Sequence, residues 1–182
     1  MGDKRIAWAI TGAGHALEEC IDTMLNYENV DIFLSRAAEE VLCMYKLDTR
    51  LNAPGVRIYR ETKASSPLIG RLFSGTYQGL VIAPATSNSV AKFVHGISDT
   101  LITNLFAQAG KSHVPIIVYP TDLGPEMDSL SPHQESLKVY PRPIDLENTV
   151  KLGAFPGVAV VSNRAELERC LSSELAWGKH GR

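Results

Sequence analysis

The sequence predicts an α/β fold: a doubly wound parallel sheet of about six strands, in a single domain formed by residues 1–182. Six short apolar runs recur along the chain, and most are continuously apolar and rich in Ile and Val, which is typical of strands buried on both faces of a parallel sheet. Helical patterns separate most of these runs, as crossovers between parallel strands require. The chain also has the length of about one domain and can bury a core without disulfides.

The expected strands and helices follow from the spacing of apolar residues. The expected strands are residues 5–11, 30–35, 56–59, 79–84, 114–120 and 157–162, and the expected helices are residues 15–27, 36–46, 67–73, 87–109, 146–152 and 164–175. The helix over 87–109 has an apolar face that is wide for a single sheet contact, so we expect it to meet a neighbouring subunit as well. Gly110 fits the position just after its end.

A proline-rich segment, residues 120–143, interrupts the alternation of strands and helices. Five prolines lie there among Gly, Ser and Asp, so we expect no regular structure. From residue 121 to residue 147 the chain has six acidic and two basic residues, a local charge of −4. A solvated excursion is one interpretation of this segment, and a lid or an intersubunit arm is the other.

Composition argues against several classes of protein. The formal charge of −2 gives no basic excess for nucleic acid or a membrane surface. No apolar run approaches the roughly 20 residues that span a bilayer, and the first residues do not resemble a secretory signal, so we expect a cytoplasmic protein. Cys20, Cys43 and Cys170 are scattered in helical patterns, which predicts buried, reduced thiols. The five histidines lack ligand spacing, so we expect no metal site.

The turn after the first expected strand has the composition of an anion site. Gly12, Ala13 and Gly14 lie between the strand and the first helix, where backbone N–H groups bind phosphate. The dinucleotide fingerprint is incomplete, because Leu17 replaces its third glycine and Ser35 ends the second strand in place of an acidic residue. These residues therefore favour a monophosphate, and the alternative is a tight turn with Ser35 as a helix N-cap.

Hydrogen-bonding side chains also follow the fourth expected strand. Thr86, Ser87, Asn88 and Ser89 open the long helix, and four in a row exceed what capping requires, although capping is the default explanation. Ligands of open α/β sheets bind at the carboxyl ends of strands. We therefore expect the turns after the first, second and fourth strands to form one crevice.

Asp99 is expected inside the long helix. His95 and Thr103 lie four residues to either side of it, so the three would form one polar stripe. Facing the crevice, Asp99 would accept hydrogen bonds from a polyol. A solvated helix surface is the alternative.

Residues 83–92, followed by 96–103, closely resemble the signature of the flavoprotein superfamily of FMN-dependent cysteine decarboxylases and flavin prenyltransferases. The resemblance extends from residue 6 to about residue 152, and residues 6–15 are most similar to the archaeal-type branch, which includes FMN-containing dihydromethanopterin reductases. It implies a Rossmann-like, flavodoxin-like subunit that binds FMN between the protomers of a trimer, often assembled further.

The resemblance also implies which residues bind the cofactor. It assigns Gly12, Ala13, Gly14 and Ser35 to the phosphate end, and Thr86, Ser87, Asn88 and Ser89 to the phosphate, ribityl and ring region, with Asp99 nearby.

Departures from the superfamily pattern point to a reductase. The position of the decarboxylase histidine is Gly70, and no histidine lies between His15 and His95. The prenyltransferase lysine is missing, and its arginine after the fifth strand is replaced by Pro120 and Thr121, with Arg142 as a substitute candidate.

We therefore expect an FMN-dependent oxidoreductase that reduces a dihydropterin with electrons from NAD(P)H or a redox protein. No catalytic side chain is nominated, because the flavin N5 carries the chemistry. The alternatives are a divergent cysteine decarboxylase, a prenyl transfer enzyme and a non-enzymatic electron carrier.

Overall fold

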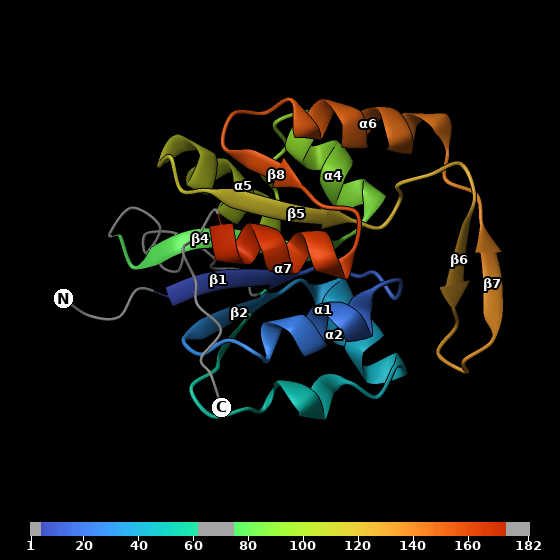
Figure 1. Ribbon diagram of the computed structural model, residues 1–182, viewed down its shortest axis with the longest axis horizontal. Helices are drawn as coiled ribbons and strands as arrows, with labels where there is room; N and C mark the ends of the chain where they lie inside the picture. Colours follow the sequence, from blue (N-terminus) through green and yellow to red (C-terminus); the bar gives the residue numbers. More distant parts are fainter. Residues whose placement is uncertain (1–4, 62–74, 174–182) are drawn as a thin grey trace.

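A six-stranded parallel sheet lies at the centre of the protein, in the order β3-β2-β1-β4-β5-β8 (Figure 1). The structure is a computed structural model that describes residues 5–61 and 75–173. The strands are β1 (Arg5–Ile10), β2 (Val30–Leu34), β3 (Arg57–Arg60), β4 (Tyr77–Ala85), β5 (Ile116–Pro120) and β8 (Val158–Val160). The predicted fold class, a doubly wound parallel sheet of about six strands, is confirmed.

The strands at the centre of the sheet are buried on both faces. In β1, Ile6, Trp8 and Ile10 pack into the core on one face of the sheet, whereas Ala7 and Ala9 belong to the core on the other face. Successive strand residues point to opposite faces, so a continuously apolar run supplies two cores at once. This explains why apolar and polar residues do not alternate along these strands, as they do in a sheet with one face exposed to solvent.

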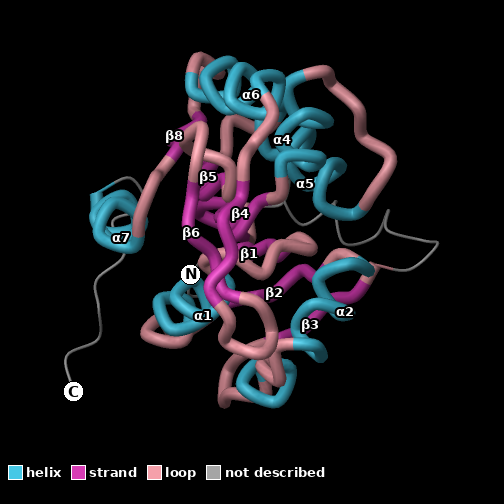
Figure 2. Tube along the Cα trace, turned by 90° about the vertical axis from the view of Figure 1, so that its right-hand side faces the viewer, coloured by secondary structure: helices cyan, strands magenta, loops and turns pink. Residues whose placement is uncertain are grey.

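Helices cover both faces of the sheet. They are α1 (Leu17–Met24), α2 (Arg36–Met44), a 3₁₀ turn (Asp48–Leu51), α4 (Ser87–Val94), α5 (Leu101–Lys111), α6 (Pro143–Gly153) and α7 (Arg164–Ser173). Figure 2 shows α1 and α7 on one side of the sheet and α4 and α5 on the other. The expected helix over residues 67–73 lies outside the described residues. Within the described residues, each helix is too short or too polar to span a bilayer.

The expected single helix over 87–109 is wrong, because the structure has two helices there. Gly96 ends α4 with a φ of +70°, which a residue with a Cβ adopts at a cost. Thr100 then starts α5 as the N-cap of a capping box with Thr103. The apolar spacing continues across the break, which hid these two end signals. Gly110 is likewise inside α5, which extends to Lys111.

The expectation of no regular structure in residues 120–143 is also wrong. An antiparallel hairpin forms from β6 (Met127–Leu130) and β7 (Ser136–Val139), and Figure 1 shows it standing apart from the central sheet. At its tip the Ser131 hydroxyl accepts hydrogen bonds from the N–H groups of His133 and Glu135. Most hairpin side chains are exposed, so the apolar alternation by which a strand is predicted is weak.

The three cysteines lie in helices and form no disulfide bonds, but they are not all buried. Cys20 is fully buried in α1, and this burial raises the pKa of its thiol. Cys170 is half-buried. The prediction of a buried thiol is wrong for Cys43, which is exposed on α2. The buried face of this helix is formed by Ala38 and Leu42.

Candidate functional site

A cleft of about 410 Å³ lies where the turns after β1, β2, β3 and β4 meet at the carboxyl edge of the sheet. Its lining comes from the turn after β1, the starts of α2, α4 and α5, and the residue after β3. The lining residues are Thr11, Gly12, Ser35, Arg36, Ala37, Glu40, Glu61, Thr86, Asn88, Ser89, Lys92, Thr100 and Ile102. We call this hollow the edge cleft.

Thr11 joins two of these turns. Its hydroxyl donates to the carbonyl oxygen of Pro84 at 3.0 Å and accepts a hydrogen bond of 2.8 Å from the N–H of Thr86. Thr11 is 2 % exposed, so the two bonds are shielded from water. The turn after β1 and the start of α4 are therefore held as one unit.

Gly12 lets the turn after β1 approach α2. A Cβ at this position would lie 2.5 Å from the Cβ of Ala37 and 3.2 Å from its carbonyl carbon. At Gly14 a Cβ would lie 2.3 Å from the Tyr45 hydroxyl oxygen, at the other end of α2. Neither glycine has a positive φ, so backbone strain does not explain them. Close packing against α2 requires Gly12, whereas the contact at Gly14 is with the far end of the Tyr45 side chain, which can move.

Ser35 and Thr86 cap helices as well as line the edge cleft. The Ser35 hydroxyl accepts a hydrogen bond from the N–H of Ala38 at 3.1 Å, and the Thr86 hydroxyl accepts one from Ser89 at 3.3 Å. The capping interpretation therefore holds for both residues, but both also line the edge cleft.

The structure brings five of the nine predicted cofactor residues together in the edge cleft: Gly12, Ser35, Thr86, Asn88 and Ser89. Ala13 is buried behind the turn, and Gly14 lines a different pocket. Ser87 lies in the first turn of α4 without lining the edge cleft.

The predicted placement of Asp99 within a helix is wrong. Asp99 lies in the connection between α4 and α5, so no helix joins it to Thr103 in a polar stripe. Its carboxylate accepts hydrogen bonds of 2.8 and 2.9 Å from the Lys92 ammonium group, which lower the pKa of Asp99. Asp99 reaches the edge cleft only through Lys92, because it does not line the cleft itself.

Arg142, the substitute candidate from the proline-rich segment, is engaged elsewhere. Its guanidinium donates two hydrogen bonds of 2.8 Å to the carboxylate of Asp145, and its own position is the N-cap of α6. It does not line the edge cleft.

Glu61 is the lining residue that sequence reasoning missed most clearly. It directly follows β3, and the carboxyl end of a parallel strand is where ligand-binding residues gather. This position is a local signal, but it is a weak one, because the strand before it is short and is not fully buried. Arg36 and Lys92 also line the cleft and supply positive charge.

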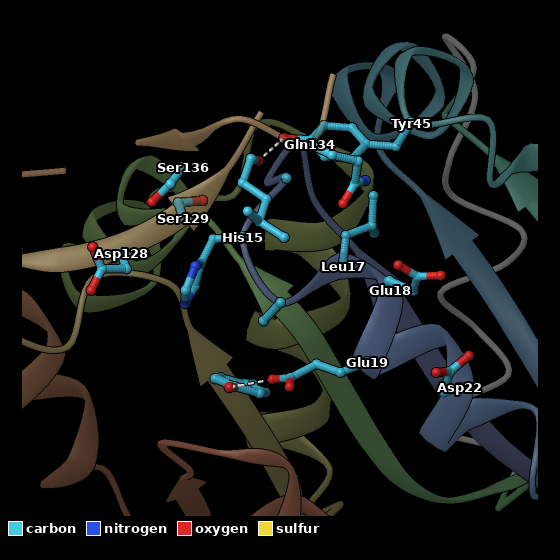
Figure 3. Close-up of a pocket in the computed structure, with 14 residues that line it drawn as sticks. His15, Leu17, Glu18, Glu19, Asp22, Tyr45, Asp128, Ser129, Gln134 and Ser136 are labelled. Atoms are coloured by element: carbon cyan, nitrogen blue, oxygen red, sulfur yellow. Dashed lines mark hydrogen bonds between the residues drawn. The ribbon is translucent and has the colours of Figure 1, made fainter. Parts of the chain in front are cut away.

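A second hollow, of about 630 Å³, lies on the other side of the turn after β1 (Figure 3). We call it the hairpin pocket, because β6, β7 and their connection form one wall. The residues that line it are Gly14, His15, Ala16, Leu17, Glu18, Glu19, Asp22, Tyr45, Tyr119, Asp128, Ser129, Leu130, Gln134 and Ser136. Tyr45 donates a hydrogen bond of 2.8 Å to the carbonyl oxygen of Leu130, which fastens the hairpin to the end of α2.

The hairpin pocket is acidic, because four carboxylates line it: Glu18, Glu19, Asp22 and Asp128. Glu18 and Asp22 are both paired with Arg50, and Asp128 is paired with Lys138. Glu19 instead accepts a hydrogen bond of 2.6 Å from the Tyr119 hydroxyl. Burial, together with this carboxylate, raises the pKa of Tyr119 well above its usual value, so the phenol stays protonated and remains a donor.

Within residues 5–61 and 75–173, no group of three or more His, Cys, Asp or Glu side chains could hold a metal ion.

Comparison with known proteins decides the family. The Flavoprotein family profile matches residues 1–179. The chain belongs to the Flavoprotein family. The resemblance read from residues 83–103 is therefore confirmed.

Two curated relatives of this Flavoprotein chain are dihydromethanopterin reductases (acceptor). The protein from Methanocaldococcus jannaschii is 44 % identical over 133 residues, which are 66 % of this chain and 54 % of that protein. The protein from Methanosarcina mazei is 40 % identical over 146 residues, which are 73 % of this chain and 61 % of that protein. The matched part thus spans less than two thirds of either relative.

A solved structure matches this Flavoprotein chain over nearly its full length. It is DmrB from Burkholderia xenovorans in complex with FMN, described as a cubic protein cage for redox transfer. It is 40 % identical, has a TM-score of 0.85, and the match covers 96 % of this chain and 97 % of that one.

Proposed function

We propose that this protein holds FMN in the edge cleft and is a reductase that transfers electrons from NAD(P)H or a redox protein to a dihydropterin. The observation that carries the proposal is the meeting of four turns in one cleft at the carboxyl edge of the sheet, in a chain related to FMN-binding and dihydropterin-reducing proteins. FMN supplies the hydride and electron transfer, so the chain's residues bind, orient and exclude water.

The first turn of α4 suits a phosphate group. Within the described residues, the N–H groups of Ser87 and Asn88 donate to no other group, as expected for the first turn of a helix. The partial positive charge of a helix N-terminus and the nearby Lys92 both favour an anion there. We assign the phosphate to this turn and to the turn at Gly12, Ala13 and Gly14.

Hydroxyl groups around the same cleft suit the sugar-like chain of FMN. Ser35, Thr86 and Ser89 each have a hydroxyl that lines the edge cleft or caps a helix beside it, and Asn88 adds an amide. Hydroxyls and amides both donate and accept, as recognition of a polyol requires. Thr86, Asn88 and Ser89 are assigned to the ribityl and ring region, and the Ser35 hydroxyl is assigned to the phosphate end.

The hairpin pocket is assigned to the electron acceptor. It shares the turn after β1 with the edge cleft, through Gly12 on one side and Gly14 on the other. A pterin ring carries N–H donors on its pyrimidine edge, and carboxylates such as Glu19 accept hydrogen bonds of this kind. The tyrosines and Leu17 supply apolar surface for a flat ring.

We also propose that the protein works in the cytoplasm as a homo-oligomer built from trimers. Support comes from the cage described for DmrB and from exposed apolar side chains on the hairpin and α6. These side chains are Leu130, Leu137, Val139, Tyr140, Ile144 and Val150. The exposed Ile97, between α4 and α5, supports a subunit contact near those helices.

The proposed reaction predicts two colour changes. The purified protein is expected to be yellow and to release FMN, identified by mass. Anaerobic addition of NADPH, or of a reduced redox protein, is expected to bleach the flavin, and a dihydropterin is expected to restore the colour. A colourless protein that does not bind FMN contradicts the flavin assignment. A flavin that is reoxidised by redox proteins but by no dihydropterin favours an electron carrier instead.

Glu19→Gln tests the acceptor site. Because a hydrogen bond to a charged group contributes about 1.5–3 kcal/mol, this variant is expected to raise the KM for the dihydropterin about tenfold or more. FMN content is expected to stay at the wild-type level. Glu18→Gln is the matched control, since Glu18 lies at the pocket, is largely exposed and is paired with Arg50. Equal KM values for both variants and the wild type would place the acceptor elsewhere.

A further inference from the structure

Glu61 bridges two helices across the edge cleft. One carboxylate oxygen, Oε1, accepts a hydrogen bond of 2.8 Å from the N–H of Leu101, the first residue of α5. The other, Oε2, accepts one of 3.1 Å from the N–H of Arg36, the first residue of α2. Both oxygens are thus used at helix N-termini, and the same side chain lines the cleft.

Three helix N-termini meet at the edge cleft, but they do not offer equal capacity for an anion. In α2 and α5 the first N–H is taken by Glu61, and the full negative charge of the carboxylate lies beside it. In α4 the N–H groups of Ser87 and Asn88 have no partner among the described residues. The start of α4 is therefore the most favourable of the three for a phosphate, because the charge of Glu61 opposes an anion at the other two.

Each of the two positively charged residues that line the cleft, Arg36 and Lys92, also lies beside a carboxylate. Lys92 is paired with Asp99, so its charge is partly balanced before any ligand binds. The backbone N–H of Arg36, on α2, donates a hydrogen bond to the Glu61 carboxylate, so the two residues are neighbours. An arginine at the end of the second strand is a position that can accept a further phosphate in this type of fold. The carboxylate of Glu61 opposes that use.

We infer that Glu61 is a specificity-determining residue that restricts the edge cleft to one phosphoryl group, and so selects a flavin mononucleotide over a flavin dinucleotide. This inference rests on the proposed function, because it requires the flavin phosphate to bind in the edge cleft. The preference for FMN over FAD would then depend on the single side chain of Glu61, which is far in sequence from the turns assigned to the phosphate.

The test compares the affinities of FMN and FAD for the oligomeric protein after its flavin has been removed. Fluorescence quenching gives a Kd for each flavin, with the wild type expected to prefer FMN. Glu61→Gln keeps the size of the side chain and removes its charge. This variant is expected to reduce the ratio of the two affinities by about tenfold, mainly through tighter FAD binding, since one charge at close range to an anion has an effect of at least that size at low salt.

Two variants separate charge from shape. Glu39→Gln is the matched control, because Glu39 is also a carboxylate on α2, but it is paired with Arg60 and does not line the edge cleft. It is expected to leave the ratio unchanged. Glu61→Asp keeps the charge and is expected to keep the preference for FMN. An unchanged ratio in Glu61→Gln, or an equal change in Glu61→Gln and Glu61→Asp, overturns the inference.

A measurement on the wild type covers the case in which Glu61→Gln does not fold. FMN and FAD carry similar net charge, so salt screens their overall attraction to the protein alike, whereas repulsion by Glu61 acts on the second phosphoryl group. Raising the ionic strength is therefore expected to narrow the gap between the two affinities, and a constant gap overturns the inference. If the wild type binds neither flavin, the proposed function itself fails; this result is distinct from a failure confined to Glu61.

Discussion

Gly12→Val is expected to lose most of the bound flavin and to destabilise the fold by about 1–3 kcal/mol, the usual cost of overpacking a tight contact. The reason is geometric: even the first added carbon would lie 2.5 Å from the Ala37 Cβ and close to the backbone of α2. The turn after β1 would have to move away from α2, and both line the edge cleft. Flavin absorbance per protein and urea unfolding measure the two effects.

A second glycine provides the control for Gly12. Gly110 lies inside α5, and a Cβ there meets nothing within 4 Å. Gly110→Ala is therefore expected to keep the flavin and to raise the free energy of unfolding by about 0.5–1 kcal/mol, because alanine favours a helix over glycine.

Removing the opposing methyl group tests the geometric explanation directly. In the double variant Gly12→Ala with Ala37→Gly, the shortest contact is gone, although the contacts of 3.2 and 3.3 Å to the Ala37 backbone remain. We expect it to hold more flavin than Gly12→Ala alone. Equal flavin loss in the single and double variants would show that contact with Ala37 is not the cause.

Asp31→Ala is expected to lower the free energy of unfolding by about 3–5 kcal/mol, the cost of removing one partner of a buried ion pair. Asp31 is fully buried in β2 and accepts a hydrogen bond of 2.7 Å from the Arg5 guanidinium. The Tyr77 hydroxyl donates to its other oxygen, also at 2.7 Å. The variant leaves the Arg5 charge without its carboxylate, at the end of the sheet opposite the edge cleft. Urea unfolding measures the change.

Two further variants bracket the expected effect at Asp31. Tyr77→Phe removes one of its hydrogen bonds and is expected to cost about 1–3 kcal/mol. Lys138→Ala breaks ion pairs with Glu126 and Asp128 that are exposed on the hairpin, and it is expected to cost less than about 1 kcal/mol. If Asp31→Ala is no more destabilising than Lys138→Ala, the buried network does not have the stabilising role assigned to it.

The central sheet and the turns at its carboxyl edge were predictable, because the signals for them are local. A run such as residues 5–11 is apolar throughout, and this pattern is specific for a strand buried on both faces. Small and hydroxyl-bearing residues such as Gly12 and Thr86 directly follow those runs. Parallel strands end at the same edge of the sheet, so the meeting of these turns followed from the strand assignment alone.

The break between α4 and α5 and the β6–β7 hairpin were not predicted, although local signals for the break exist. Gly96 and the pair Thr100 and Thr103 mark a helix end and a new start, but the apolar spacing runs across them. In β7, exposure of both faces removes the alternation that identifies a strand, and in β6 one face is only half-buried. Where two local signals compete, the packing of the chain decides between them.

The parallel sheet, the family and the chemical character of the edge turns follow from local sequence patterns, since each of these depends on residues that are neighbours along the chain. Three features follow from folding instead: Glu61 bridges α2 and α5, Lys92 holds Asp99, and the hairpin closes a second hollow beside the edge cleft. These contacts join side chains and backbone groups brought together by folding, and the energy of such a contact depends on distances that no local pattern specifies.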